Sequence, residues 1–408
     1  MRKQELIRVG DFRLGRTETE SILEVLASGR LSEGPKVAQF EKEWAGYVGT
    51  RYCVATSSGS GALICGLSAV KHLKGLPSAT KVVTSPLTYI ATSSAISSVG
   101  FEPVFVDVDP VTFGISPERI RSHLLDAPDR QKYALVVPIH LMGFPVPMDD
   151  INRVAEEFGL LVMEDSAQAH GSRYNGKRTG ALSLAAAFSF YIAHNIQAGE
   201  MGALTTDDPD ISRLARKLKA QGRACDCLVC TRDQGICPQL GGDGEEEDFD
   251  PRFSHDMIGY NFKLMEFQAA LGLVQLKNAD EIIRRRQSNV RYLNEHLADH
   301  GDLLQLPPYS DDVSYLAYPM VIKRPDVISR RELRRALESN GVETRPLFGS
   351  IPTQQPAYGH LRDEYSGKLP VAERLGKQAF YVGCHQYLSP DDLEYMVRVF
   401  HQVLRSKR

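Results

Sequence analysis

The stretch Phe188-Ser-Phe-Tyr-Ile-Ala-His-Asn-Ile-Gln-Ala-Gly-Glu-Met-Gly-Ala203 joins two apolar runs through a polar, glycine-containing segment. The runs at its ends predict β-strands at Ala186 to Phe190 and at Ala203 to Thr206, the second as an antiparallel partner in the sheet. His194 lies between them. An imidazole has an unperturbed pKa of about 6.5 and is a good proton carrier near neutrality. The stretch therefore predicts a strand pair in the core and a group for acid–base chemistry beside it.

Outward from this stretch, helix-period segments alternate with short β-branched runs. Further strands are predicted at Tyr52 to Thr56, Lys81 to Thr84, Pro103 to Val106, Ala134 to Ile139 and Leu160 to Met163. The helices between them are predicted at Ser60 to Lys74, Thr88 to Ser98, Ser116 to Leu125 and Met148 to Phe158. This alternation is typical of an α/β fold with a mostly parallel sheet and helices on both faces.

The pattern changes near residue 284. Beyond it the sequence predicts helices at Arg284 to His300, Ser329 to Asn340 and Pro390 to Ser406, and a strand within Ser314 to Ile322. We interpret residues 1–283 as a large domain and residues 284–408 as a smaller C-terminal domain, which a chain of 408 residues can accommodate. An irregular, cysteine-rich insertion occupies about residues 224–253 of the large domain.

Composition narrows the class of protein. Hydrophobic residues make up 42%, charged residues 24%, and the net charge is -3, so nothing indicates nucleic-acid binding. No apolar run reaches the roughly 18 to 20 residues that a membrane span needs. The charged N-terminus lacks the apolar stretch of a signal peptide. We therefore expect a cytoplasmic protein that binds neither nucleic acid nor membrane.

Two further motifs follow predicted strands. Ser57-Ser-Gly-Ser-Gly-Ala-Leu63 opens a helix, so the backbone amides and hydroxyls at Gly59, Ser60 and Gly61 would face an anion such as a phosphate. A plain helix cap is the alternative interpretation. Glu164-Asp-Ser-Ala-Gln-Ala-His-Gly171 ends a strand that we expect to be buried.

These motifs resemble those of the DegT/DnrJ/EryC1/StrS sugar aminotransferases, from about Leu31 to the C-terminus. That family's EDxAQAHG and NGT/SGS motifs are similar to the two just quoted, and its SF-x-x-x-K-N-x-x-x-GE-x-G segment is similar to residues 188–203. The resemblance implies a pyridoxal phosphate (PLP)-dependent transferase of fold type I, like aspartate aminotransferase. Its large domain carries a mostly parallel seven-stranded sheet, and its smaller C-terminal domain is also α/β.

The resemblance also implies roles for single residues. Asp165 would pair with the pyridinium nitrogen and Gln168 would lie near the ring. Tyr89 would stack on the pyridine face, with core packing as the alternative. Ser189 would bind the phosphate, and Asn261 would reach the phosphate of a neighbouring subunit, which requires a homodimer.

His194 stands where the family has the lysine that holds the cofactor as a Schiff base, and an imidazole has no primary amine for this. The substitution resembles the sugar 3-dehydratase branch, as do Phe380-Tyr-Val-Gly-Cys384 and Glu343-Thr-Arg-Pro-Leu-Phe-Gly349. Arg345 is then a candidate contact for the substrate or its phosphates, with a surface salt bridge as the alternative.

That branch removes the 3-hydroxyl of a nucleotide-linked 4-keto-6-deoxyhexose. The resemblance implies that pyridoxamine phosphate (PMP) condenses with the 4-keto group and that His194 takes a proton from the 4′ carbon of the cofactor. Electrons drawn through the ring that Asp165 keeps protonated would then expel the hydroxyl.

Cys225, Cys227, Cys230 and Cys237 are four of the seven cysteines. Clustered thiolates suit an iron-sulfur cluster or structural zinc, and spacing alone does not choose between these and redox-active thiols. The resemblance to the iron-sulfur subgroup of the 3-dehydratases implies a cluster, [2Fe-2S] in type, that relays electrons from a ferredoxin- or flavin-type reductase.

The favoured hypothesis is therefore a PMP- and iron-sulfur-dependent nucleotide-sugar 3-dehydratase. Three alternatives stay open: a cluster-free dehydratase that regenerates PMP from glutamate, a non-catalytic aminotransferase homologue, and a related deoxygenase of a non-hexose or aminocyclitol substrate.

Overall fold

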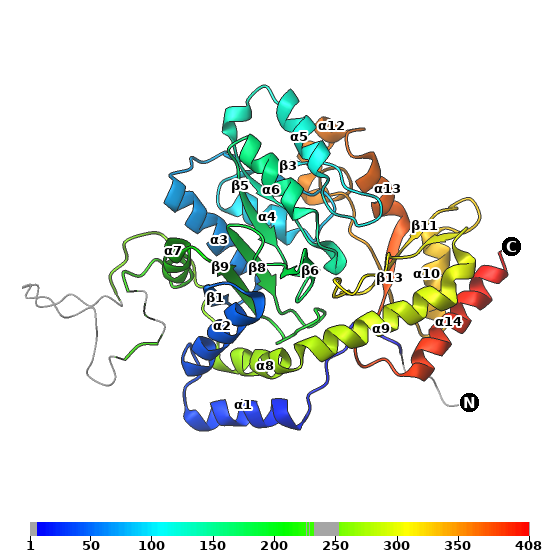
Figure 1. Cartoon of the computed structure of the whole chain (residues 1–408), viewed down its shortest axis with the longest axis horizontal. Coiled ribbons are helices and arrows are strands. Elements are labelled where there is room, and N and C mark those ends of the chain that lie inside the picture. The colour runs from blue at the N-terminus through cyan, green and yellow to red at the C-terminus, as the bar shows by residue number, and fades with distance from the viewer. Residues whose placement is uncertain (1–5, 226, 228, 232–252, 408) are drawn as a thin grey trace, which may run out of the picture.

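The structure is a computed structural model that describes residues 6–225, 227, 229–231 and 253–407, and a seven-stranded sheet forms its centre (Figure 1). The strand order is β1-β9-β8-β5-β4-β2-β3. The strand bounds are β1 Tyr52–Thr56, β2 Lys81–Thr84, β3 Glu102–Phe105, β4 Tyr133–Val137, β5 Leu161–Asp165, β8 Ala185–Ser189 and β9 Gly202–Thr206. Every strand predicted for this sheet is present, with its ends shifted by two residues or fewer.

Only β9 runs against the other strands. It pairs antiparallel with β1 and with β8, whereas the remaining neighbours in the sheet pair in parallel. Both the mostly parallel sheet and the antiparallel partner at the end of the opening stretch are thereby confirmed. The carboxyl ends of the parallel strands consequently meet at one edge, where open α/β sheets bind ligands.

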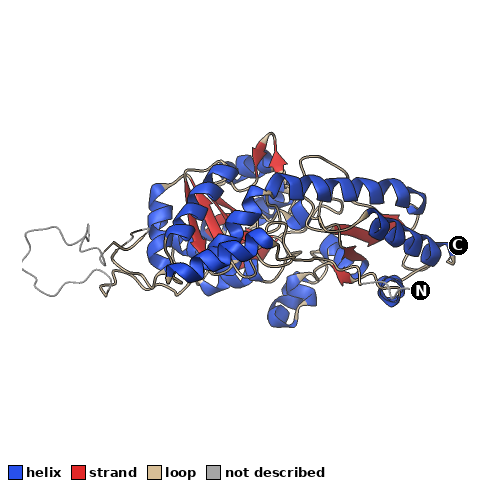
Figure 2. Ribbon diagram, turned by 90° about the horizontal axis from the view of Figure 1, so that it is seen from below, coloured by secondary structure: helices blue, strands red, loops and turns tan. Residues whose placement is uncertain are grey.

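Helices cover both faces of this sheet, and Figure 2 shows its strands lying between them. Side chains alternate between the faces: Val54 packs with α3, α4 and α7, whereas its neighbours Cys53 and Ala55 pack with α2 and α8. Helices α5 and α6 cover the rest of the second face. The helix bounds are α2 Pro35–Val48, α3 Gly59–Lys74, α4 Ala91–Ser98, α5 Pro117–Asp126, α6 Met148–Glu157, α7 Pro209–Lys219 and α8 Glu266–Lys277.

The C-terminal part has its own antiparallel sheet, in the order β10-β11-β13-β12. Its strands are β10 Leu304–Gln305, β11 Tyr318–Ile322, β12 Thr344–Pro346 and β13 Ala379–Val382. The helices around it are α9 Ala279–Leu297, α10 Arg330–Ser339, α11 Ile351–Gln354, α12 Arg362–Tyr365, α13 Pro370–Gln378 and α14 Pro390–Arg405. The domain boundary expected at residue 284 falls inside α9, which continues from the large sheet toward the small one (Figure 1).

Two predicted elements begin three or more residues later than expected. The strand expected from Ser314 begins only at Tyr318, because the carbonyl groups before it accept hydrogen bonds from side chains, two of them from Arg286. The helix expected from Thr88 begins at Ala91.

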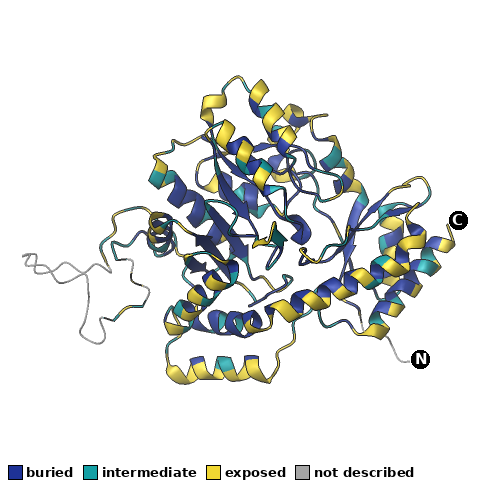
Figure 3. Ribbon diagram, viewed as in Figure 1, coloured by how far each residue is buried: buried dark blue, intermediate teal, exposed yellow. Residues whose placement is uncertain are grey.

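The remaining described α-helix is the N-terminal α1 Arg16–Ser28, and the remaining described strands are β6 Arg173–Tyr174 and β7 Lys177–Arg178, which form a hairpin. Helix α1 is exposed along most of its length (Figure 3). Within the described residues, no helix combines the length and the apolar character needed to cross a membrane.

Candidate active site

A cavity of about 430 Å³ lies at the carboxyl ends of the parallel strands. Strand β5 ends there with Asp165 and β8 with Ser189, while helix α3 begins there just after β1. The structure brings eight predicted site residues together in its lining: Gly59, Ser60, Tyr89, Asp165, Gln168, Ser189, His194 and Arg345. Residues distant in the sequence therefore converge on one site because the strand topology carries them to one edge.

His194 is half-buried in the irregular loop after β8. Its Nδ1–H donates to the backbone carbonyl of Ser189 at 2.6 Å, which leaves the lone pair on Nε2. The loop is anchored on both sides, since Asn195 Nδ2 donates to the carbonyl of Ser314 and the N–H of Ile196 donates to Nδ1 of His170. Burial lowers the pKa of His194 to about 4, against the opposing effect of the Ser189 hydrogen bond. At neutral pH the ring is thus an unprotonated base held in one tautomer.

Asp165 is a buried carboxylate at the end of β5. Thr92 donates its hydroxyl to one carboxylate oxygen at 2.6 Å, and the N–H of Ala167 donates to the other at 3.1 Å. Burial raises the pKa of Asp165, although both hydrogen bonds oppose the shift. Among the described residues, no cationic side chain pairs with it. A buried carboxylate without a cationic partner in the protein is suited to bind a cationic N–H group of a ligand.

The start of α3 offers donors for an anion. Ser58 caps the helix, because its hydroxyl accepts the N–H of Gly61 at 3.1 Å. The first N–H groups of a helix have no intrahelical partner, so those of Gly59 and Ser60 remain at the positive end of the helix dipole. A Cβ on Gly59 would lie 2.5 Å from the Cβ of Ser189, so the glycine lets the Ser189 side chain come close to this helix end.

Tyr89 and Gln168 both line the cavity. Tyr89, in the loop before α4, is 61% exposed, and its ring centroid is 5.9 Å from that of Phe348. Gln168 accepts the N–H of Met142 with its Oε1 at 2.9 Å. The amide oxygen is thereby occupied, which leaves the NH₂ group of Gln168 as the donor for a ligand.

The small sheet supplies the other wall. Arg345 of β12 lines the cavity together with Phe348 and Tyr381, and Arg345 faces Tyr381 across the β12–β13 pair. Arg345 Nη2 lies 3.2 Å from a carboxylate oxygen of Glu343. The salt bridge considered as an alternative is therefore present, and the same arginine also lines the cavity.

Two predicted cofactor residues do not line the cavity. Gly61 is buried in the first turn of α3, where a Cβ would lie 3.2 Å from the ring of Phe262. Asn261 is exposed and forms an isolated antiparallel bridge with Ala220. Its expected role concerns a neighbouring subunit and stays a prediction.

The three described cysteines of the cluster are not among the residues that line this cavity. Cys225 is half-buried, Cys227 and Cys230 are exposed, and Cys237 lies outside the described residues. Within the part of the chain that is described, no group of three or more His, Cys, Asp or Glu side chains is placed to hold a metal ion. The four-cysteine ligand set consequently stays a prediction.

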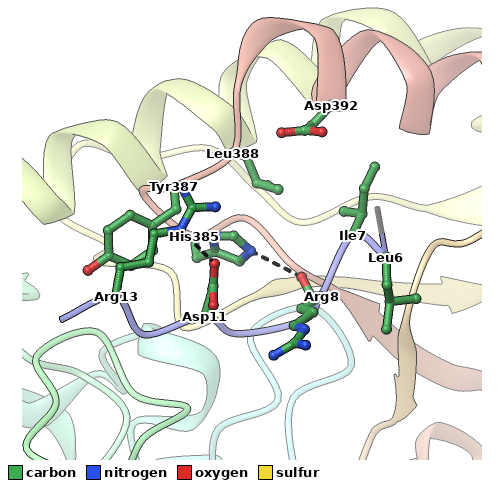
Figure 4. A pocket seen from close by; sticks show the side chains of 9 residues that line it. All are labelled: Leu6, Ile7, Arg8, Asp11, Arg13, His385, Tyr387, Leu388 and Asp392. Carbon is green, nitrogen blue, oxygen red and sulfur yellow. Dashed lines mark hydrogen bonds and ion pairs between the residues drawn. The ribbon is translucent and has the colours of Figure 1, made fainter. Parts of the chain in front are cut away.

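A second cavity, of about 590 Å³, lies beside the N-terminal segment (Figure 4). It is lined by Leu6, Ile7, Arg8, Asp11, Arg13, His385, Tyr387, Leu388 and Asp392. Its acids already have partners: Asp11 pairs with Arg13 at 2.9 Å, and Asp392 accepts the N–H of Ser389 at the start of α14. It contains no predicted site residue, so the first cavity is the candidate active site.

Sequence reasoning overlooked several residues of that cavity. Ser58, Thr92, Phe348 and Tyr381 all line it without having been singled out. Ser58, Phe348 and Tyr381 stand inside the motifs quoted above, so the motifs were the available signal. Thr92 lies eight residues after the end of β2, and only the fold brings its hydroxyl to Asp165.

Comparison with known proteins finds relatives that match along nearly the whole chain. A "dTDP-4-dehydro-2,6-dideoxy-D-glucose 3-dehydratase" of Saccharopolyspora spinosa is 29% identical over 96% of this chain and 85% of its own length. The structure of an E. coli GDP-4-keto-6-deoxy-D-mannose-3-dehydratase with bound hydrated PLP matches with a TM-score of 0.84 at 25% identity, covering 97% of this chain and 100% of that one.

An aminotransferase also shares the fold. The structure of Helicobacter pylori PseC, an aminotransferase of pseudoaminic acid biosynthesis, matches with a TM-score of 0.85 at 21% identity, over 98% of this chain and 100% of that one. The fold type I architecture is thereby confirmed. The sequence model described as the DegT/DnrJ/EryC1/StrS aminotransferase family matches residues 13–401. Since that match spans nearly the whole chain, the protein belongs to the DegT/DnrJ/EryC1/StrS aminotransferase family.

Proposed function

We propose that the protein is a PMP/PLP-dependent 3-dehydratase that deoxygenates C-3 of a nucleotide-linked 4-keto-6-deoxyhexose. The observation that carries this proposal is the chemistry of the cavity wall: His194 lines it, and no lysine is among the described lining residues. A transaminase of this family needs a primary amine there to hold its cofactor. Relatives named as dehydratases and a structural neighbour named as an aminotransferase both occur. Because no lysine amine is among the described lining residues, a dehydratase is favoured over an aminotransferase.

The residues present fit the cofactor. The buried carboxylate of Asp165, which lacks a cationic partner within the described chain, suits a protonated pyridine nitrogen. The N–H groups of Gly59 and Ser60 and the hydroxyl of Ser189 suit a phosphate. Tyr89 offers an aromatic face and Gln168 an amide donor along the same wall.

When bound, such a cofactor supplies an electron sink for a developing carbanion. The protein would contribute a base that takes a proton from the 4′ carbon of the cofactor and side chains that hold the cofactor and the substrate. His194 takes up the proton at Nε2, because its Nδ1–H is committed to the carbonyl of Ser189. A base of this kind typically contributes about 10² to 10⁴ in rate. Asp165 keeps its negative charge beside the cationic N–H, and Arg345 holds the anionic part of the substrate.

The redox half of the proposal rests on the cysteines. Elimination leaves an unsaturated product that one-electron donors must reduce, and Cys225, Cys227, Cys230 and Cys237 would hold an iron-sulfur cluster, [2Fe-2S] in type, for this purpose. A ferredoxin- or flavin-type reductase would be the electron donor. We further propose that the protein acts as a homodimer, with Asn261 reaching the phosphate site of the partner subunit.

The function is tested by product analysis. The purified protein, loaded with PMP, is incubated with CDP-, dTDP-, GDP- and UDP-linked 4-keto-6-deoxyhexoses and a reducing system, and products are weighed by mass spectrometry. We expect a product that lacks the 3-hydroxyl oxygen. A 4-amino sugar formed with glutamate as donor would instead identify an aminotransferase and contradict the proposal.

The cluster is tested separately by anaerobic purification followed by iron and sulfide analysis and an absorbance spectrum. We expect iron and sulfide in equal amounts, and their loss in Cys225→Ser and Cys230→Ser. Cys384→Ser serves as the control, because that buried cysteine lies in the C-terminal core. A protein without iron that turns over with glutamate alone is the cluster-free dehydratase, which overturns the redox half while leaving the role of His194 intact.

A further inference from the structure

Three side chains on one face of the small sheet form a connected group. Glu343 and Arg345 are two residues apart along the extended chain that leads into β12, so they point to the same face. Arg345 lies opposite Tyr381 of β13 in the sheet register. Burial raises the pKa of Tyr381, and the charge of Arg345 and a hydrogen bond from it oppose this shift. Arg345 and Tyr381 both line the active-site cavity, whereas Glu343 does not.

The carboxylate of Glu343 fixes one edge of the Arg345 guanidinium. Its Oε1 accepts from Nε at 3.3 Å and from Nη2 at 3.2 Å. A guanidinium is a rigid plane with five N–H donors, so holding the Nε–Nη2 side determines where the remaining donors point. Arg345 is 43% exposed in its side chain, and an arginine at such a position is otherwise free to take many rotamers.

The second oxygen of Glu343 is occupied elsewhere. Oε2 accepts the N–H of Val9 at 2.9 Å, and the neighbouring Ile7 forms a parallel bridge with Val342. The N-terminal segment is held further by His385, which donates from Nε2 to the carbonyl of Arg8 at 3.2 Å (Figure 4). The carboxylate that holds Arg345 is therefore itself held by backbone, and its position does not depend on a ligand.

We infer that Glu343 is a positioning residue that aims Arg345 at the diphosphate of a nucleotide-sugar substrate. The inference rests on the proposed function, which supplies the substrate class. Glu343 does not touch the substrate, and its own charge repels a diphosphate. Removing the charge of Glu343 therefore has two opposing effects on diphosphate binding. Loss of the repulsion tightens binding, and release of the Arg345 guanidinium weakens it. The two hydrogen bonds to Arg345 make the second effect the larger one.

The test measures nucleoside diphosphate binding by calorimetry with CDP, dTDP, GDP and UDP in turn. The holoprotein is compared with Glu343→Gln, Arg345→Ala and the double variant. Glu343→Gln keeps the shape of the side chain and an acceptor for the N–H of Val9. Glu338→Gln is the matched control, because Glu338 pairs with Arg334 and bonds Thr344 of the same strand without touching Arg345.

We expect Arg345→Ala to raise Kd about 10- to 100-fold and Glu343→Gln to raise it about three- to tenfold, with Glu338→Gln near the wild type. In the Arg345→Ala background, Glu343→Gln should add nothing. In turnover, Glu343→Gln should raise KM by the same factor and leave kcat within about twofold.

Each other outcome has a definite meaning. Unchanged or tighter binding in Glu343→Gln overturns the inference, as does an equal weakening in the Arg345→Ala background, while the proposed function stands in both cases. Failure of the wild type to bind any of the four nucleotides, or binding by Arg345→Ala as tight as the wild type, contradicts the assigned substrate site and with it the inference.

Discussion

Burial shifts the two titratable groups at the heart of the cavity in opposite senses. It lowers the pKa of His194 to about 4 and raises that of Asp165, because a low dielectric disfavours charge on either group. The unprotonated imidazole is thereby ready to accept a proton. A cation beside the Asp165 carboxylate would favour its ionised form, against the effect of burial. Pairs of groups displaced in this way mark acid–base sites.

This pairing makes Asp165→Asn informative. The amide cannot offer the negative charge that a pyridinium N–H requires, so we expect PMP and PLP to bind at least about tenfold more weakly, measured by absorbance titration. Asp150→Asn is the control, because Asp150 is a half-buried residue of α6 that pairs with Arg153 and does not line the cavity. Equal cofactor affinity in Asp165→Asn and the wild type would show that the carboxylate serves another purpose.

At the level of single residues, the motifs located most of the candidate site because each stands at a strand end. Asp165 and Ser189 close β5 and β8, and Gly59 opens α3, so local pattern and family resemblance sufficed. Thr92 could not be found in this way, since its contact with Asp165 joins residues 73 positions apart. The hydrogen bond from His194 to the Ser189 carbonyl, which fixes the tautomer, was likewise invisible in the sequence.

Among the elements, the start of α3 depends most on one residue type. A side chain at Gly59 would collide with Ser189, whose Cβ lies 2.5 Å from the Cβ that an alanine would carry there. We expect Gly59→Ala to lose about 1 to 3 kcal/mol of unfolding free energy through overpacking and to bind the cofactor phosphate less tightly. Urea unfolding and cofactor titration measure the two effects.

Gly46→Ala is the matched control. Gly46 lies in α2, is exposed, and a Cβ there would meet nothing within 4 Å. Alanine in an exposed helix should therefore add about 0.5 to 1 kcal/mol of stability. If Gly59→Ala were as stable as Gly46→Ala, the close approach of α3 to Ser189 would not be real.

Element boundaries were less predictable than element types. The segment before β11 has the composition of a strand, yet Tyr315 adopts a positive φ of 48° and the carbonyls of Tyr315 and Leu316 accept from the buried Arg286. Apolar patterning reports burial but not which partner takes each carbonyl. Local sequence therefore identified the buried segment and could not show where its ladder begins.

For the whole molecule, buried histidines tie stability to pH. Burial lowers the pKa of His385 to about 4 and holds that of His170 well below its usual value. The folded state binds fewer protons than the unfolded state, so this stability is present above a pH of about 6.5 and is lost as pH falls toward about 4. The raised pKa of Asp165 has the opposite effect on the pH dependence of stability. It is a single group, whereas several histidines act in the first sense.

We expect the urea concentration at the unfolding midpoint to decrease as the pH is lowered from about 7.5 to about 5. In His385→Gln the fall should be smaller, because glutamine does not titrate and can still donate to the carbonyl of Arg8. A midpoint that stays constant or rises on acidification would mean that these histidines are protonated in the folded state.

The proposed homodimer would cover apolar side chains that are exposed in the single chain. Leu23 and Leu26 of α1 are 57% and 52% exposed, and Ile258, three residues before Asn261 in the sequence, is 93% exposed. His194→Asn and Asn261→Ala homodimers should each be inactive. When mixed through unfolding and refolding, they should recover about a quarter of the wild-type activity, because the heterodimer holds one intact site. No recovery would place Asn261 in the site of its own subunit.

We propose above all that His194 is the base of a deoxygenation. The most direct measurement compares wild type and His194→Asn, each loaded with PMP, for release of the 3-hydroxyl from the accepted nucleotide sugar. We expect His194→Asn to bind PMP with wild-type affinity, since the contacts of Asp165 and the α3 N-terminus are untouched, and to lose at least about 10²-fold in turnover. Unchanged turnover in His194→Asn would contradict it.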